Sequence, residues 1–472
     1  MRCTFVRLGE TMLQTVTVPT KALDDYRLIA GDDKISAIQA VAAPLRGARV
    51  LHLNATAFGG GVAELLTALV PLSRSAGLEV DWKVMAGAPE LWETTKAIHN
   101  LLQGANLATT SAASRLNAVR KGRRAVAEQR VITALWNPAM AEIWQRYNAL
   151  TAELFDQSYD YVVVHDPQPA GVLHFLRQLK PELARAKWIW RCHIDLTRAS
   201  PDVWSFLRPY LALYDAAIFT MQEYVKPDVP VSHVALIAPA IDPLSTKNTD
   251  LPLEVVRDIL RRYDIDPDRP LITQVSRFDP WKDPLGVIDV YRRIKRDIPG
   301  LQLALVGSMA ADDPEGWRFY ELTARHAGND FDIHILTNFN GVGNVEVNAF
   351  QRASNAVLQK SIREGFGLTV SEALWKGRPV VATAVGGIPL QVASGQSGYL
   401  VQSIRECADR TRELLTNPEL TSEFGLAGRE RVRDNFLITR YLSDYLQLFG
   451  DLTTQTQASA RTRTLSASRS RP

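Results

Sequence analysis

The sequence predicts an α/β protein built from two doubly wound, Rossmann-like domains. The chain has 472 residues, and a single hydrophobic core rarely serves more than about 250–300 residues. Short apolar runs rich in β-branched residues alternate with longer amphipathic stretches, which is typical of a parallel sheet with helices on both faces. The alternation occurs in two series, separated by the turn-rich segment Ala238–Asn248 with its two prolines.

The first series predicts an N-terminal domain over residues 1–240. Strands are expected at Arg49–Leu53, Leu78–Met85, Tyr161–Val164, Lys187–Trp190 and Ala216–Thr220. Helices are expected at Val62–Ala76, Pro89–Gln103, Ala113–Gln129 and Ala139–Phe155. Because strands and helices follow one another in this order, the sheet should be parallel.

The second series predicts a C-terminal domain over residues 241–435. Its strands are expected at Leu271–Val275, Leu301–Val306, Asp332–Leu336, Ala356–Leu358 and Pro379–Thr383, and one of its helices at Leu368–Trp375. An amphipathic stretch at Tyr441–Leu452 predicts a helix within 436–452 that packs back on the N-terminal domain. Residues 453–472 are mainly Ser, Thr, Arg and Gln, which predicts a disordered tail.

Composition excludes several classes of function. The formal net charge is only +3, and binding of nucleic acid or of a membrane surface would call for a clustered basic excess. No run approaches the roughly 20 apolar residues of a membrane span, and the first residues lack the apolar core of a signal peptide. Three widely spaced cysteines, Cys3, Cys192 and Cys407, fit neither a disulfide framework nor a metal site. We therefore expect a cytoplasmic protein with small-molecule ligands.

Two cations follow the strand at Leu271–Val275, in the loop SRFDPWKDP. Open parallel sheets bind ligands beyond the carboxyl ends of their strands, so Arg277 and Lys282 lie where a ligand is expected. Arg offers a forked donor for phosphate oxygens and Lys a compact charge. The pair could neutralise a diphosphate leaving group without a metal ion, although each residue alone could equally be an ordinary surface cation.

Two glutamates and two glycines follow the strand at Ala356–Leu358, in the segment EGFGLTVSE. Glu364 lies in the loop, and Gly365 and Gly367 let the backbone approach a ligand closely. The helix expected from Leu368 directs its first N–H groups at this loop, which suits a phosphate. Glu372 lies about one turn into that helix. One glutamate could hold a sugar and the other a ribose; a second glycine pair, Gly386 and Gly387, ends the next strand.

The N-terminal half carries weaker signals at the ends of its strands. The loop NATAFGGGVAE contains Gly59, Gly60 and Gly61 between a strand and a helix, which suits a phosphate but is not a dinucleotide-binding fingerprint. The segments HDPQP and RCHID place Asp166, Gln168 and His193 after two further strands.

The glutamate pair, the Arg/Lys loop and the GGIP segment together resemble the retaining glycosyltransferases of family 4, which have the GT-B fold. This resemblance covers about residues 45–450 and implies two Rossmann-like domains that face a central cleft. It implies that Arg277 and Lys282 hold the donor diphosphate. It also implies that Glu364 contacts the donor sugar and Glu372 the ribose, with Gly365, Phe366, Gly367, Leu368 and Thr369 completing the donor site.

The segments NATAFGGGVAELLTALVPL, HDPQPAG, WRCHIDL, APAIDPLSTKN and QVSRFDPWKDP resemble a narrower group, the trehalose glycosyltransferring synthases. This resemblance implies reversible transfer of glucose from ADP- or UDP-glucose to free glucose, giving α,α-trehalose. It places His193 near the 6-hydroxyl of the donor sugar, Gly59–Gly61 near the diphosphate, and Asp166 and Gln168 in the acceptor pocket.

Several alternatives stay open from the sequence. A trehalose phosphorylase would use phosphate in place of the nucleotide, another family 4 enzyme would use a different acceptor, and a silent sugar-nucleotide binding protein would lack turnover. No metal ion or other cofactor is expected, because Asp264–Asp268 (DIDPD) precedes a strand and fits a polar turn better than a metal site. The sequence leaves the nucleobase, the physiological direction and the oligomeric state undecided, with a homodimer as one option.

Overall fold

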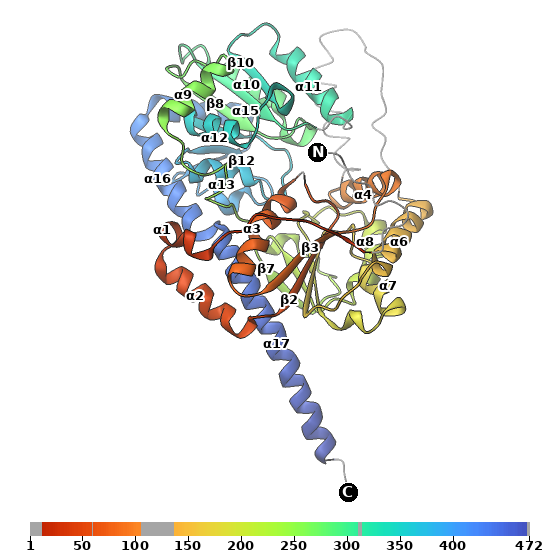
Figure 1. Ribbon diagram of the computed structural model, residues 1–472. Helices are drawn as coiled ribbons and strands as arrows, with labels where there is room; N and C mark the ends of the chain where they lie inside the picture. The colour runs from red at the N-terminus through yellow and green to blue at the C-terminus, as the bar shows by residue number, and fades with distance from the viewer. Residues whose placement is uncertain (1–11, 59, 105–135, 310–313, 470–472) are drawn as a thin grey trace. The chain divides into compact units, whose positions relative to one another are not determined.

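The computed structural model describes residues 12–58, 60–104, 136–309 and 314–469, with side chains described except at 314, 315 and beyond residue 454 (Figure 1). The chain forms two compact units. Unit 1 comprises Met1–Ala238 and Tyr441–Pro472, and unit 2 comprises Pro239–Arg440. The division after Ala238 lies close to the domain boundary expected after residue 240.

Unit 1 is built on a seven-stranded sheet of order β1-β3-β2-β4-β5-β6-β7. Its strands are β1 (Gln14–Thr15), β2 (Arg49–Asn54), β3 (Glu79–Val84), β4 (Tyr161–His165), β5 (Lys187–Arg191), β6 (Ala216–Phe219) and β7 (His233–Leu236). Its helices before α17 are α1 (Arg27–Ala30), α2 (Asp32–Ala42), α3 (Gly61–Ser75), α4 (Pro89–Leu102), α6 (Pro138–Glu153), α7 (Val172–Leu179) and α8 (Pro201–Leu211). All neighbouring strands are parallel except β1, which pairs antiparallel with β3.

Unit 2 is built on a six-stranded, fully parallel sheet of order β10-β9-β8-β11-β12-β13. Its strands are β8 (Leu271–Val275), β9 (Gln302–Gly307), β10 (Ile333–Thr337), β11 (Ala356–Gln359), β12 (Val380–Thr383) and β13 (Gly398–Val401). Its helices are α9 (Leu253–Arg262), α10 (Pro284–Ile294), α11 (Pro314–Ala327), α12 (Asn344–Ala353), α13 (Leu368–Trp375), α14 (Ile388–Gln391), α15 (Ile404–Thr416) and α16 (Pro418–Asn435).

Both faces of the unit 2 sheet are buried, which explains why its strands are continuous apolar runs. Successive side chains of a strand point to opposite faces. In β9, Leu303 and Leu305 belong to one core cluster, whereas Ala304 and Val306 belong to the other. The predicted α/β class with two Rossmann-like domains is confirmed.

The strands that the sequence analysis missed, β1, β7 and β13, all lie at a sheet edge. β1 gives no apolar signal, because both its residues are polar and exposed. β7 (HVAL) and β13 (GYLV) are mostly apolar but only four residues long. The helix expected at Ala113–Gln129 lies outside the described residues.

The final helix, α17 (Ile438–Arg469), belongs to unit 1 from Tyr441 onward. Its buried face includes Leu442, Tyr445 and Phe449, and the Phe449 ring stacks on Tyr161 with 4.5 Å between ring centroids. The backbone stays helical as far as Arg469, whereas the sequence predicted a disordered tail from residue 453. A run of Thr, Gln, Ala, Arg and Ser without Gly or Pro contains nothing that ends a helix.

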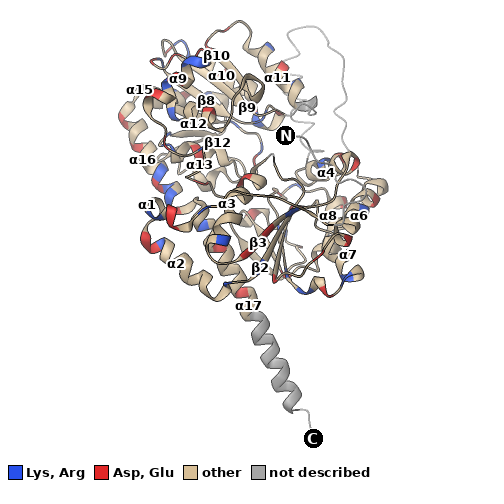
Figure 2. Cartoon of the chain, viewed as in Figure 1, with Lys and Arg blue, Asp and Glu red and all other residues tan. Residues whose placement is uncertain are grey.

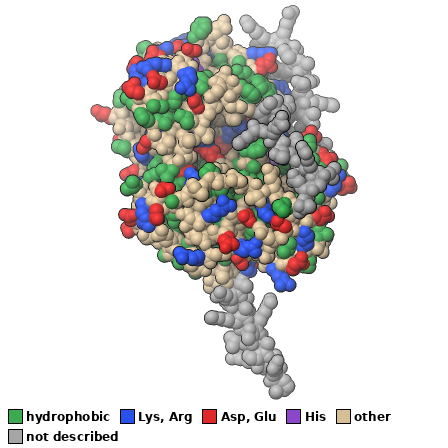
Figure 3. Space-filling model, in the orientation of Figure 1, with side chains coloured by type: hydrophobic (Ala, Val, Ile, Leu, Met, Phe, Trp, Pro, Cys, Tyr) green, Lys and Arg blue, Asp and Glu red, His purple; other side chains and the backbone are tan. Residues whose placement is uncertain are grey.

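Charged residues of both signs are spread over the surface helices of each unit (Figure 2). On the face shown in Figure 3, the described Lys and Arg side chains are interspersed with Asp and Glu side chains. None of the described helices has the length and apolar character that crossing a membrane requires.

Candidate active site

Three loops of unit 2 lie close together, because they follow the carboxyl ends of the neighbouring parallel strands β8, β11 and β12. The loop after β8 carries Arg277 and Lys282, and the loop after β11 carries Glu364 and leads into α13. The structure thus brings the predicted donor residues of this unit together.

The loop after β8 is shaped by two aspartates. The Asp279 side chain accepts hydrogen bonds from the backbone N–H groups of Trp281 (3.0 Å) and Lys282 (3.1 Å). Asp283 has a left-handed backbone with φ of 47° and caps α10 through the N–H of Gly286 (3.1 Å). These local contacts fix the course of the loop and direct Lys282 toward the β11 loop.

The β8 and β11 loops are joined through their backbones. The Trp281 carbonyl accepts from the Ile362 N–H at 2.7 Å. Gln274 accepts from the Lys360 N–H at 3.0 Å and donates to the Lys282 carbonyl at 3.0 Å. The two loops therefore form one preorganised surface.

Lys282 and Glu364 form an ion pair across these loops. The Lys282 side chain is only 16% exposed, so it is not an ordinary surface cation. Glu364 also accepts from Gln359 at 3.2 Å and from the Ser361 hydroxyl at 3.3 Å. Beside this pair, Lys360 forms a second ion pair with Asp283.

Arg277 is 70% exposed, and its Nη2 atom lies 3.1 Å from Oδ2 of Asp279. Burial raises the pKa of the Asp279 carboxyl, while Arg277 and Lys282 act in the opposite direction. The exposed guanidinium can reach a ligand, whereas the buried carboxylate holds the loop.

Gly367 sets the start of α13. Its φ of +83° is a left-handed conformation that favours glycine, and a Cβ atom there would lie 3.2 Å from Cγ of Glu364. Leu368 and Thr369 are the first residues of α13, and N–H groups at a helix start have no carbonyl one turn before them. The arrangement suits an anion, and Phe366 is buried beneath it.

Glu372 is fully buried, with 0% of its side chain exposed. The Nζ atom of Lys247 lies 3.2 Å from Oε1 of Glu372, but among the described residues neither carboxylate oxygen has a hydrogen bond of good geometry. The ion pair gives Coulomb attraction without filling the acceptor sites. A buried carboxylate with unfilled acceptor sites is costly, so the position fits a ligand that donates hydroxyl groups.

Three charged residues around the donor loops were missed as functional candidates: Lys247, Asp279 and Lys360. Lys247 lies in the segment Ala238–Asn248, which was expected to be the interdomain linker and which also carries part of the family resemblance. Its neighbour Asn248 is buried and accepts from Lys376 at 2.9 Å. The only sequence signal for Lys247 was the TKN stretch, as part of the resemblance to the trehalose glycosyltransferring synthases.

Unit 1 places its predicted residues in the loops after β2, β4 and β5, which are adjacent strands. Asp166 has a left-handed backbone with φ of 63°, which Asp tolerates better than most residues. Its carboxylate accepts from the backbone N–H of His193 at 2.8 Å. Burial raises the pKa of the Asp166 carboxyl to about 7, although the His193 N–H and the Arg191 guanidinium oppose this.

The loop that carries Asp166 and Gln168 is anchored by side chains that donate to its carbonyl groups. Trp190 donates to the Asp166 carbonyl at 3.0 Å, and Asn148 donates to the Gln168 carbonyl at 3.0 Å. The Gln168 residue is half-buried. The backbone contacts hold the loop and leave the Gln168 amide available for a ligand.

A chain of three histidines ends at His193. Nδ1 of His52 lies 3.0 Å from Nε2 of His165, and Nδ1 of His165 lies 3.0 Å from Nε2 of His193. His52 and His165 are buried, and His193 is half-buried. No pattern in the sequence marks His52, which lies inside β2.

Gly60 and Gly61 lie at the start of α3 in unit 1. Gly60 precedes the helix with φ of +94°, and Gly61 is its first residue. Gly59 lies outside the described residues. The predicted site residues therefore form two groups, one in each unit.

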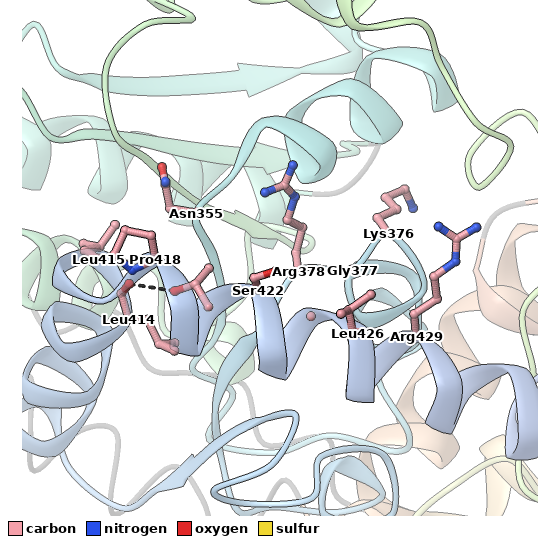
Figure 4. A pocket seen from close by; sticks show the side chains of 12 residues that line it. Asn355, Lys376, Gly377, Arg378, Leu414, Leu415, Pro418, Ser422, Leu426 and Arg429 are labelled. Atoms are coloured by element: carbon pink, nitrogen blue, oxygen red, sulfur yellow. Dashed lines mark hydrogen bonds between the residues drawn. The ribbon is translucent and has the colours of Figure 1, made fainter.

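Unit 2 also has a pocket of about 420 Å³ that is separate from the donor loops (Figure 4). It is lined by Asn355 and Arg378, which precede β11 and β12, and by Arg429 of α16. Residues that precede parallel strands lie at the amino ends of the strands, opposite the carboxyl ends that carry the donor loops. The pocket is therefore not the predicted donor site.

Within the described part of the chain, no group of three or more His, Cys, Asp or Glu side chains is arranged to hold a metal ion.

Comparison with known families matches both halves of the chain. Residues 52–133 and 131–226 match a family profile described as the N-terminal domain of trehalose synthase. Residues 255–431 match the profile of glycosyl transferases group 1.

Individual relatives match nearly the whole chain. A trehalose synthase of Rubrobacter xylanophilus is 49% identical over 444 residues, which cover 93% of this chain and 99% of the relative. A trehalose synthase of Pyrococcus horikoshii is 45% identical over 433 residues, which cover 92% of this chain and 97% of the relative.

Among solved structures, an α,α-trehalose 6-phosphate synthase from Burkholderia multivorans matches with a TM-score of 0.64. The match covers 89% of this chain and 99% of that chain at 16% identity. At this identity the likeness concerns the fold alone, and it agrees with the predicted GT-B class.

Proposed function

The chain belongs to the trehalose synthase family of glycosyltransferases, and we propose that it transfers glucose with retention from ADP- or UDP-glucose to free glucose. The product is α,α-trehalose, and the reaction is reversible. One observation carries the choice of a nucleotide donor: the fully buried carboxylate of Glu372 has no hydrogen bond to either oxygen within the described structure. Ribose hydroxyl groups would fill these acceptor sites, and inorganic phosphate would not.

The donor diphosphate binds Arg277, Lys282 and the first N–H groups of α13. Arg277 is exposed enough to reach it. Lys282 would exchange its ion pair with Glu364 for the diphosphate, which leaves Glu364 to accept hydrogen bonds from the glucosyl hydroxyls. The loop glycines Gly365 and Gly367 let the ligand approach the backbone.

In unit 1, His193 binds the donor sugar, Asp166 and Gln168 bind the acceptor glucose, and the glycines before α3 approach the diphosphate. These roles follow the family resemblance. They are supported by the position of all three loops at the carboxyl ends of adjacent strands.

Retention follows from front-side attack. The glycosidic bond to the nucleotide breaks as the acceptor hydroxyl approaches the same face of the sugar, and a donor phosphate oxygen takes the acceptor's proton. Arg277, Lys282 and the helix start stabilise the developing phosphate charge. The chemistry requires no metal ion, because two cations and a helix start neutralise the leaving group.

The test is to incubate the protein with glucose and each NDP-glucose in turn, then identify the disaccharide and its anomeric configuration by NMR. We expect α,α-trehalose from ADP- or UDP-glucose, and formation of NDP-glucose when trehalose and the nucleoside diphosphate are supplied. Cleavage of trehalose with inorganic phosphate, and not with ADP or UDP, would identify a phosphorylase instead. A different disaccharide would identify another acceptor.

A further inference from the structure

The three-histidine chain of unit 1 has a geometry that restricts its protons. His165, the middle ring, contacts His52 through Nε2 and His193 through Nδ1, each at 3.0 Å. Neighbouring rings lie 5.3 Å apart between centroids on both sides. Because both nitrogen atoms of His165 have a histidine partner, the rings do not converge on a metal position.

The surroundings keep the three rings neutral. Burial lowers the pKa of His52 to about 3, and burial together with Arg191 lowers the pKa of His193 well below its usual value. Arg191 is fully buried, and its Nη2 atom donates to the Ile237 carbonyl at 2.8 Å. Its positive charge disfavours a proton added to the chain.

Other groups around the chain are Asp166 and two tyrosines of α17. Asp166 accepts from the His193 backbone rather than from its ring. The Tyr445 ring lies 6.0 Å from His52 between centroids, and Tyr441 lies 6.0 Å from the Arg191 guanidinium. Burial raises the pKa of Tyr445 well above its usual value, so it stays uncharged beside His52.

A neutral imidazole has one N–H donor and one acceptor nitrogen. His165 must therefore donate to one neighbour and accept from the other, which leaves two consistent states. In one state all three rings carry the proton on Nδ1, and the remaining nitrogen of His193, Nδ1, is a donor. In the other state all three carry it on Nε2, and Nδ1 of His193 is an acceptor.

We propose that His165 and His52 are positioning residues for His193, because this directional chain fixes whether Nδ1 of His193 donates to or accepts from a sugar hydroxyl. The identity of the ligand, a hydroxyl of the glucosyl donor, rests on the proposed function. The coupling of the three rings is a property of unit 1 alone and can be tested without any ligand.

The first test is NMR of the ligand-free full chain with ¹⁵N-labelled histidine at pH 7. We expect three neutral rings with the same tautomer, joined by two ¹⁵N–¹⁵N couplings through their hydrogen bonds. Mixed tautomers within the chain, a protonated ring or missing couplings would overturn the proposal. This result does not depend on any transferase activity, so a failure of the proposed function would be recognised separately.

The second test uses variants of the middle ring. An Asn amide lies near the place of Nδ1 and a Gln amide near that of Nε2, so His165→Asn should keep the contact with His193 and His165→Gln should lose it. We expect His165→Gln to raise KM for NDP-glucose about 10-fold, in line with one lost hydrogen bond, and His165→Asn to restore most of the loss. His174→Gln on α7 is the matched control, because His174 contacts Gln178, Phe175 and Tyr210 rather than the three rings, and it should not change KM for NDP-glucose.

A modified donor separates a positioning role from a general structural one. With an NDP-6-deoxyglucose donor, wild type and His165→Gln should differ less than twofold, because the hydroxyl that His193 contacts is absent. An equal loss with both donors, or equal loss in the Asn and Gln variants, would overturn the positioning role.

Discussion

Replacing Glu372 with Gln separates a ligand-binding carboxylate from a structural one. The substitution keeps the size of the side chain and removes its charge. In the ligand-free structure neither oxygen of Glu372 has a hydrogen bond to a described residue, so the variant loses no acceptor contact. It loses only the attraction of Lys247, whose Nζ lies 3.2 Å away.

The two expected effects differ in size. The substitution leaves the Lys247 ammonium, only 17% exposed, without its buried partner, so the free energy of unfolding should fall by up to about 3–5 kcal/mol. For a unit of this size each kcal/mol lowers Tm by about 2–4 °C. Binding of a nucleotide should lose the charge assistance of its ribose contacts, about 1.5–3 kcal/mol. That corresponds to a Kd raised about 10- to 100-fold.

Isothermal titration with ADP and UDP measures the binding term, and thermal unfolding measures the stability term. Inorganic pyrophosphate, which has no ribose, should bind the variant and wild type alike. Glu346→Gln is the matched control, because Glu346 caps α12 through the Gly343 N–H at 2.9 Å and pairs with Arg262 at 3.6 Å, and neither residue belongs to the predicted site. A nucleotide Kd within twofold of wild type together with a clearly lower Tm would refute the ribose role.

Four further outcomes are expected. Arg277→Ala and Lys282→Ala should each lower kcat by about 10²-fold or more, as loss of transition-state charge stabilisation does, and unchanged turnover in the double variant would exclude the leaving-group role. Treatment with EDTA should leave kcat unchanged; a loss that Mg²⁺ restores would contradict metal-free chemistry. Asp166 has its folded pKa raised to about 7, so its contribution to stability is greatest below its unfolded pKa and is lost as pH rises from about 4 to 7. In urea titrations, Asp166→Asn should therefore gain relative to wild type across that window, by up to about 4 kcal/mol, and a constant difference would contradict the shift. Gly387→Ala would place a Cβ 2.9 Å from the Gly365 carbonyl, so KM for NDP-glucose should rise, and an unchanged KM would show that the loop can yield.

The central strands could be predicted because burial on both faces makes them apolar throughout. Leu271–Val275 was predicted with the same bounds as β8. The edge strand β1 (Gln14–Thr15) was missed because both its residues are polar and exposed, whereas β13 (Gly398–Val401) was missed although three of its four residues are apolar. The course of α17 beyond residue 452 was also missed, since low hydrophobicity was read as disorder, although a polar sequence can remain helical.

The donor loops could be predicted as a set because parallel strands bring the residues that follow them to one sheet edge. The pairing of charges could not, because it depends on contacts between distant segments: Lys282 with Glu364, and Lys247 with Glu372. The histidine chain was hidden for the same reason. His52 is an inward-facing strand residue, and only the register of β2 beside β4 places it next to His165.

The ion pair between Lys282 and Glu364 explains how a lysine can stay charged in a loop that water reaches poorly. An unpaired Lys282, 16% exposed, would lose much of its hydration without compensation. The ion pair with Glu364 supplies that compensation. If the proposed donor phosphate takes over Lys282, the same carboxylate becomes available to sugar hydroxyls. The proposed function therefore predicts that binding of the two halves of the donor is coupled through one ion pair, and that the effects of substitutions at Lys282 and Glu364 do not add.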